Sequence, residues 1–209
     1  MPKKAEIDFW NDIWLKPVAT VQWVYKSNPD TKFVYLFLYV LGVTFGLSSI
    51  GENVLFQNLS LTQILLLSFS FSGLGGLLTY HLYIFALSIS SKWLGGNSNF
   101  QGTRLAFSFS AFPSLLVLAV LLIQLLLFGK RALSMDPLIN PSTEGEMIFF
   151  GILTVLVFLL SIYQLFLFVI LLAKIQSFNI FKSILSYLIA LFLVFTPFIA
   201  IGMIASWLY

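Results

Sequence analysis

The sequence contains no cysteine, one histidine and few charges, since charged residues make up only 9% of its 209 residues. Without cysteine the chain has no disulfide, thiolate metal site or cysteine nucleophile. One histidine excludes a metal site built from several imidazoles. A soluble domain carries about 25% charged residues to cover its surface. Because hydrophobic residues reach 59% here, we expect the solvent of this chain to be lipid.

Charge is also missing from five long stretches, each near the length of about 20 residues with which a helix crosses a bilayer. Unpaired backbone amides are costly in lipid, and the stretches lack the alternating polarity of barrel strands. The sequence therefore predicts an all-α, polytopic membrane protein. Its domain, 33–209, is expected to be a bundle of five transmembrane helices at about 33–50, 61–89, 105–128, 147–172 and 184–208.

Residues 1–32 precede the first of these stretches and are charged throughout, so they are not expected to form a cleaved signal peptide. Ile7, Trp10 and Trp14 fall on one helical stripe. Such a short amphipathic helix is expected in the lipid headgroup layer, where tryptophan is favoured. The alternative is a tail that folds onto the cytoplasmic ends of the spans. Pro17 suits the first position of a second short helix.

The basic residues are unevenly distributed between the loops. If the N-terminus is cytoplasmic, only Lys130 and Arg131 lie on the opposite side. The positive-inside rule then predicts a cytoplasmic N-terminus and a C-terminus outside. The nine basic residues on the cytoplasmic side are Lys3, Lys4, Lys16, Lys26, Lys32, Lys92, Arg104, Lys174 and Lys182.

No acidic or basic residue lies near the middle of a predicted span, which argues against proton-coupled transport or a charged substrate. A pathway for a neutral substrate stays open. His81 lies nine residues from Ser72, about 13 Å along a helix and on the other face. A catalytic pair needs about 3 Å. We therefore expect no catalytic residues, and expect His81 to bond a neighbouring helix.

Small residues recur along the second predicted span, among them Ser72, Gly75 and Thr79, with Gly76 beside them. Small residues on one face let helices approach closely in a bilayer. We expect a packing seam, with a polar ligand groove as the alternative. Pro113, at the start of the third span, is expected to kink its helix or end a turn, as is a second proline in the fifth span.

The loop after the second span contains Gly95 and Gly96, which permit a tight turn with positive φ. Lys92 and Trp93 suit the membrane interface. A phosphate-binding loop needs a strand before its glycines and a lysine after them. Because that order is absent, no nucleotide site is expected. No other cofactor and no nucleic-acid partner is expected either.

Four short motifs stand out, K-W-L-G-G at Lys92–Gly96, F-x-x-S-x-x-P at Phe107–Pro113, W-L-K-P-V-A-T at Trp14–Thr20 and N-P-x-x-K at Asn28–Lys32. With these motifs the chain resembles the YIP family, small five-span membrane proteins that comprise the Ypt/Rab-interacting proteins and their bacterial relatives.

The resemblance implies a cytoplasmic N-terminus, an external C-terminus, a bacterial-type member and the bacterial cytoplasmic membrane. The long N-terminal region and Asp-Leu-Tyr-type motif of eukaryotic members are absent, so GTPase binding is not carried over. We expect a non-enzymatic protein whose partners are membrane lipids, other membrane proteins or a second copy of itself, and which organises them in the membrane. The alternative is a transporter or channel component for a neutral or lipid-like substrate.

Overall fold

The computed structural model describes residues 9–27, 31–52, 58–97, 99–133 and 143–207, and every regular element in these ranges is a helix. The all-α class predicted from the sequence is thus confirmed. A fifth apolar helix, Phe33–Ser49, is shorter than four helical runs that are long and apolar enough to cross a membrane. These are Leu61–Trp93, Phe100–Leu133, Glu144–Gln176 and Ile180–Pro197.

The chain divides into two compact units that interleave along the sequence. Unit 1 comprises Met1–Val34, Tyr80–Ser110 and Leu167–Tyr209. Unit 2 comprises Tyr35–Thr79 and Ala111–Phe166. Each unit is described below by itself.

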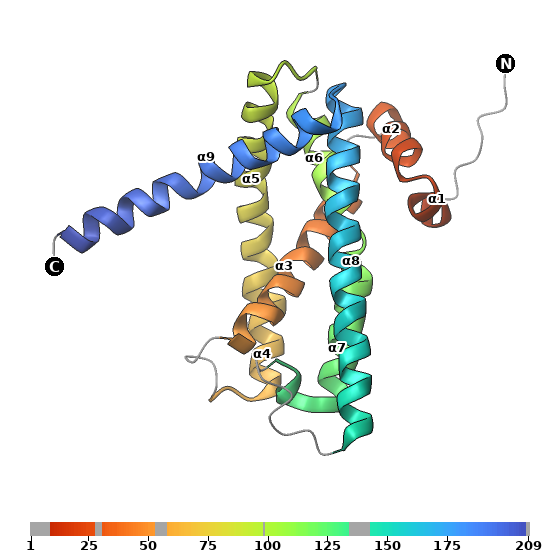
Figure 1. The fold of residues 1–209 in the computed structure, drawn as a ribbon, viewed down its shortest axis with the longest axis vertical. Coiled ribbons are helices and arrows are strands. Elements are labelled where there is room, and N and C mark those ends of the chain that lie inside the picture. The colour runs from red at the N-terminus through yellow and green to blue at the C-terminus, as the bar shows by residue number, and fades with distance from the viewer. Residues whose placement is uncertain (1–8, 28–30, 53–57, 98, 134–142, 208–209) are drawn as a thin grey trace. The chain divides into compact units, whose positions relative to one another are not determined.

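Two short helices open unit 1, α1 at Phe9–Leu15 and α2 at Pro17–Ser27 (Figure 1). Pro17 is the first residue of α2, the predicted place, where its missing N–H would have no helical partner in any case. Ile13, Val21 and Val24 are buried, and α2 lies against α6, Phe100–Ser110. Asn28-Pro29-Asp30 and Ile7 lie outside the described residues.

The core of unit 1 is aromatic. Phe107 of α6 lies 5.3 Å from Tyr83 and 5.6 Å from Phe168 between ring centroids, and Tyr187 lies 6.2 Å from Tyr83. These side chains come from α6, from α5 (Gly73–Trp93), from α8 (Glu144–Gln176) and from α9 (Ile180–Trp207). Eight of the eleven residues of α6 are buried, so this helix forms the centre of the unit.

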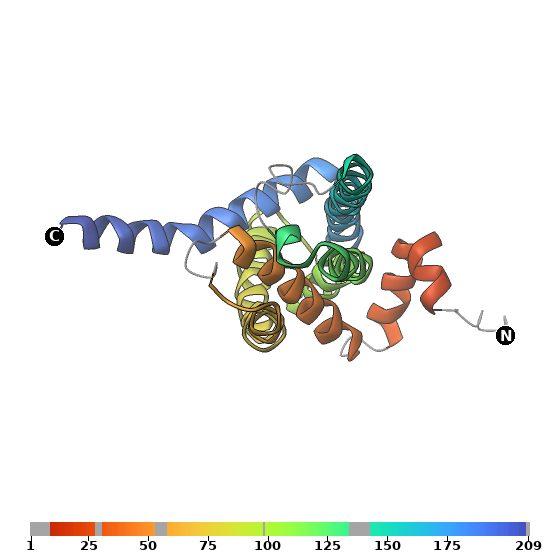
Figure 2. The same ribbon diagram turned by 90° about the horizontal axis from the view of Figure 1, so that it is seen from below.

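Helix α9 packs into unit 1 only through its first part. Ser183, Ser186 and Ala190 are fully buried, whereas Phe192 is 73% exposed. The later part of α9 runs clear of the other helices of this unit in both views (Figures 1 and 2). Pro197 lies inside the helix, which continues through it. Thr196 Oγ1 donates to the carbonyl of Phe192 at 2.5 Å in the turn before the proline.

Unit 2 packs around an apolar core between α3, Phe33–Glu52, and α7, Ser114–Phe128. Its second transmembrane run begins at α4, Leu61–Leu67, with a capping box between Ser60 and Gln63. A π-helical turn, η2 at Ser68–Ser72, separates α4 from α5. A 3₁₀ turn, η3 at Gly129–Leu133, follows α7. The buried core residues are Val43, Leu47, Ile64, Val117, Leu121 and Leu125.

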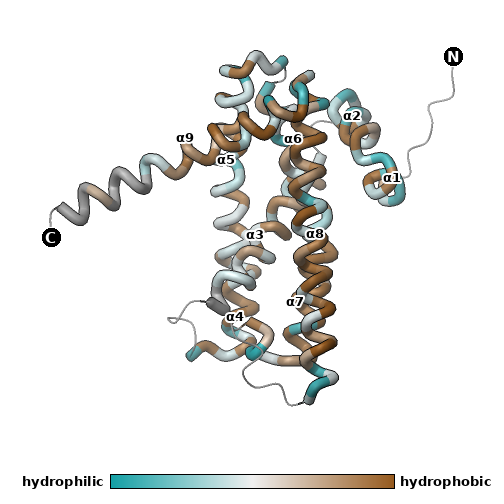
Figure 3. Tube along the Cα trace, viewed as in Figure 1, coloured by the Kyte–Doolittle hydropathy of each residue, from teal (hydrophilic) through white to brown (hydrophobic). Residues whose placement is uncertain are grey.

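The third predicted span is two helices rather than one. It begins at Phe100, where the Oδ1 atom of Asn99 accepts from the backbone N–H of Gly102 at 3.1 Å. A turn at residues 111–113 ends α6, and α7 starts directly after Pro113. A proline that ends a helical turn was one of the two outcomes expected there. Apolar residues colour most of α7 and α8 brown in Figure 3.

Candidate functional site

The loop Leu94–Asn97 at one end of unit 1 depends on both of its glycines. Gly95 has φ 83°, in the region where a side chain is strained. The N–H of Gly96 donates to the carbonyl of Ser91 at 2.9 Å, which closes the end of α5. A Cβ on Gly96 would lie 2.9 Å from that same carbonyl and would meet the side chain of Gln176. The two glycines thus serve different purposes, a turn and a close approach.

The connection between α8 and α9 holds this loop. The N–H of Asn97 donates to the carbonyl of Gln176 at 3.2 Å, while Gln176 Nε2 donates to Thr103 Oγ1 on α6 at 2.9 Å. Lys182 Nζ donates to the carbonyl of Leu94 at 3.0 Å and lies 5.7 Å from the ring centroid of Phe178. Gln176 is only 1% exposed, and these bonds satisfy its polar groups in a buried place.

Three serines extend this network into unit 1. Ser186 Oγ lies 2.9 Å from Ser90 Oγ and 2.8 Å from Ser91 Oγ, and the carbonyl of Ser186 accepts from Ser90 at 2.9 Å. All three side chains are fully buried. Ser183, one turn earlier on α9, is buried too, but its hydroxyl has no hydrogen-bond partner among the described residues. The cluster therefore ties α5 to α9 through one serine of α9.

A second close contact joins α3 to the second transmembrane run in unit 2. A Cβ on Gly42 would lie 2.6 Å from the carbonyl of Ser72 and 3.0 Å from the Cα of Gly76. A Cβ on Gly46 would collide with the Cβ and Oγ atoms of Ser72. Gly42 and Gly46 have the spacing small-x-x-x-small, the pattern that lets two transmembrane backbones touch. Sequence reasoning overlooked this pair, although the pattern is visible in the sequence.

The predicted packing seam is only partly in this contact. Ser72 and Gly76 are half-buried against α3, but Gly75 and Thr79 are exposed, and nothing lies within 4 Å of a Cβ built on Gly75. Close packing therefore does not include Gly75 within this chain. The π-helical turn η2 precedes these residues, and its i→i+5 bonds take more residues per turn. A stripe drawn at 100° per residue therefore does not keep its phase between Ser68 and the residues of α5.

The structure gives His81 and Pro113 ordinary structural surroundings. His81 is half-buried on α5, and no group of three or more potential metal ligands is found among the described residues. At the break after Pro113, Ser114 donates its hydroxyl to Gln164 Oε1 of α8 at 3.1 Å. Ser110 Oγ donates to the carbonyl of Phe107 at 2.6 Å.

Most of the network at the end of unit 1 could not be read from the sequence. Gln176 and Ser186 carry no motif, and each is one of many polar residues near the end of a span. The only signal was the pair of glycines at 95 and 96, which marks a loop that something must approach closely.

One comparison with known proteins identifies relatives of this chain. The sequence profile of the Yip1 domain matches residues 11–202, which include both helix contacts described above. No match is found among curated proteins or solved structures. Since the profile covers nearly the whole chain, the protein belongs to the Yip1 domain family.

Proposed function

We propose that this chain is a non-enzymatic membrane protein that organises lipids or partner proteins within the bilayer. The observation that supports this proposal is that buried hydroxyls form hydrogen bonds within their own helix or with a neighbouring helix. Thr44 donates to the carbonyl of Leu41 at 2.8 Å, and Ser108 donates to the carbonyl of Arg104 at 2.7 Å. The serines of α5 and α9 bond each other.

A pathway for a neutral solute needs polar groups that replace the water around that solute. A hydroxyl that donates to its own helix, or to a hydroxyl on the next helix, has its proton engaged in packing. The hydroxyls of Thr44, Ser108 and Ser186 therefore support a scaffold more than a conduit. Transport of a neutral or lipid-like substrate is the alternative function, and the permeation experiment below would detect it.

The proposed orientation places the N-terminus in the cytoplasm and the C-terminus outside, in a bacterial cytoplasmic membrane. The charges of α8 support this orientation, since Glu144 and Glu146 occupy its first turn and Lys174 its last. Lys174 and Lys182 then join the cytoplasmic majority of nine basic residues against two. The Leu94–Asn97 loop would face the cytoplasm.

Two measurements on the full chain test the proposal together. The protein purified in mild detergent is analysed by mass spectrometry for bound lipids and proteins, and we expect specific ones to copurify. The same protein in vesicles is tested by light scattering for permeation of glycerol and larger neutral solutes. We expect rates equal to those of protein-free vesicles. Permeation faster than in protein-free vesicles, and lost in the Gly46→Leu variant, would contradict the scaffold function and indicate a conduit.

A further inference from the structure

Four tryptophans of unit 1 are exposed although the helices that carry them are packed. Trp10 is 50% exposed, Trp14 37%, Trp23 44% and Trp93 66%. On α1 and α2 the packing is done by other residues, chiefly Ile13, Val21 and Val24. Trp10 also packs against Phe9 and Phe33, with ring centroids 5.3 and 5.5 Å apart, yet half of its surface stays exposed. The exposed parts of the four rings can therefore meet groups outside the chain.

The described part of unit 1 is also strongly basic. Asp12 is its only acidic residue, and it lies 4.0 Å from Lys16 in a pair whose lysine is 70% exposed. The described part of unit 2 differs, because Lys130 and Arg131 are accompanied there by three acids. The seven basic residues in the described part of unit 1 are Lys16, Lys26, Lys32, Lys92, Arg104, Lys174 and Lys182, of which the six lysines are exposed.

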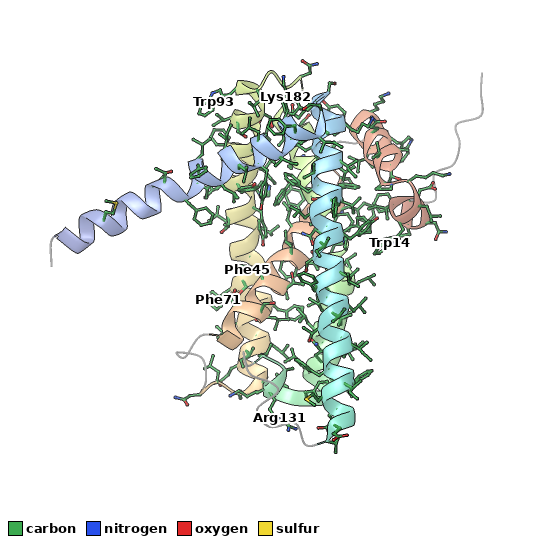
Figure 4. All side chains as sticks on the ribbon, in the orientation of Figure 1. Trp14, Phe45, Phe71, Trp93, Arg131 and Lys182 are labelled. Atoms are coloured by element: carbon green, nitrogen blue, oxygen red, sulfur yellow. The ribbon has the colours of Figure 1, made fainter. Side chains whose placement is uncertain are left out.

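One exposed tryptophan and three exposed lysines lie at the ends of long apolar helices, whereas Trp10, Trp14 and Trp23 lie on the short helices α1 and α2. Lys92 and Trp93 end α5, Lys174 lies in the last turn of α8, and Lys182 lies in the first turn of α9. Figure 4 draws Trp93 and Lys182 at the same end of unit 1. Residues at the ends of spanning helices lie at the depth of the lipid headgroups. Trp93 and these three lysines therefore meet headgroups where the runs span a membrane.

We propose that the exposed tryptophans and lysines of unit 1, here called the tryptophan–lysine face, bind anionic phospholipid headgroups. Tryptophan rings are favoured at the headgroup layer, and lysines near a surface concentrate anionic lipids. A protein partner would be expected to cover one contiguous apolar patch. Here a lysine lies close in sequence to the exposed tryptophans, with Lys16 directly after α1, Lys26 on α2 and Lys92 on α5, which suits many small headgroups. The inference rests on the proposed function and names its lipid.

The test uses the full chain with Trp14 as its only tryptophan, the other four being replaced by phenylalanine. It is reconstituted in phosphatidylcholine vesicles that contain a minor share of phosphatidylglycerol. Either the choline or the glycerol lipid carries bromine on its chains, at equal amounts. We expect the brominated phosphatidylglycerol to quench Trp14 more, with a local enrichment on the order of fivefold for one effective lysine contact.

Charge reversal supplies the control. Lys16→Glu with Lys26→Glu should abolish the preference, whereas Lys130→Glu with Arg131→Glu, in unit 2, should leave it intact. Unchanged thermal unfolding in detergent verifies that each variant is folded. The lipid that copurifies from cells should show the same effect, with more phosphatidylglycerol bound to the wild type than to the Lys16→Glu, Lys26→Glu variant.

Two outcomes would overturn the inference. Equal quenching by both brominated lipids would mean that the face has no headgroup preference. Weak quenching by either lipid, together with protection of Trp14 from aqueous iodide, would mean that a second copy of the chain covers the face. Neither result bears on the permeation measurement. The proposed scaffold function and the proposed lipid preference can therefore be contradicted independently of each other.

Discussion

The hydroxyl of Tyr39 on α3 donates to the carbonyl oxygen of Phe69 at 2.7 Å, and Phe69 lies in the π-helical turn η2. A π-helical turn leaves a carbonyl without its usual i+4 donor. Tyr39 supplies a donor from a neighbouring helix. The ring of Tyr39 also fills the space that a Cβ on Gly73 would occupy. One side chain therefore both satisfies the turn and fixes the approach of α3.

Tyr39→Phe should lower the free energy of unfolding by about 1 kcal/mol, the usual worth of an interhelical hydrogen bond in a bilayer. The ring stays, so only the bond to Phe69 is lost. Thermal unfolding in detergent measures the change. Tyr25→Phe, which removes a hydroxyl outside this contact, is the control. Equal midpoints for the two variants would show that the π-helical turn does not depend on Tyr39.

Gly46→Ala should destabilise unit 2 by about 1–3 kcal/mol, as overpacking does. The new methyl group would collide with Ser72, whose Cβ cannot move without its backbone. Gly75→Ala is the matched control because its Cβ meets open space. An alanine in an open helical position should be neutral or stabilising by up to about 1 kcal/mol. A larger loss at Gly75 in vesicles than in detergent would instead indicate contact with another molecule.

Ser186→Ala should lower the free energy of unfolding by about 1–3 kcal/mol, because it leaves a buried hydroxyl of α5 without its hydrogen-bond partner. Ser183→Ala, one turn away and equally buried, removes a hydroxyl that has no hydrogen-bond partner among the described residues. It should be neutral or stabilising. Denaturant or thermal unfolding of the two variants in one detergent compares them directly. Similar losses at both positions would contradict the assignment of Ser186 as the tie between helices.

Gly96→Ala should loosen the end of unit 1, since its methyl group would crowd the backbone carbonyl of Ser91. Gly151→Ala on α8, where nothing lies within 4 Å, is the control. Limited proteolysis after Lys92 is the readout. We expect faster cleavage in Gly96→Ala at equal overall helicity. Wild-type cleavage rates would mean that the loop tolerates a side chain and that Gln176 can retreat.

Reporter fusions at residue 1 and after Tyr209 should lie on opposite sides of the membrane. A reporter active only in the cytoplasm is expected to work at the N-terminus alone, given five spans and the bias of basic residues. A fusion within 134–142, between the third and fourth spans, should behave like the one at Tyr209. Activity at both ends would mean an even number of spans.

The class of the fold could be predicted from composition. A chain with 9% charged residues is expected in lipid, where its apolar stretches can satisfy their backbone hydrogen bonds as helices. Local breaks were also predictable where one residue decides them, as at Pro17 and Pro113. Which faces touch was not. The turn at Ser68–Ser72 shifts the phase of everything after it, and no residue in it announces a π helix.

The partners of the Leu94–Asn97 loop lay beyond sequence reasoning for a different reason. Lys182 bonds Leu94 of the loop across 88 residues of chain. Gln176 accepts from Asn97 of the loop and also bonds Thr103 on α6 across 73 residues. Contacts of this range have no periodic signature. A single sequence shows a polar residue near a span end, without showing what it meets.

These separations also set an order of events during synthesis. Ser90 and its partner Ser186 are 96 residues apart, so the hydroxyls of α5 enter the membrane well before α9 exists. Until then Ser90 has its own-helix bond to Leu87 alone. Helix α9, which leaves the ribosome after α5, therefore completes a network that α5 begins. A chain that stalls before Ile180 would carry the hydroxyls of Ser90 and Ser91 without their partner on α9.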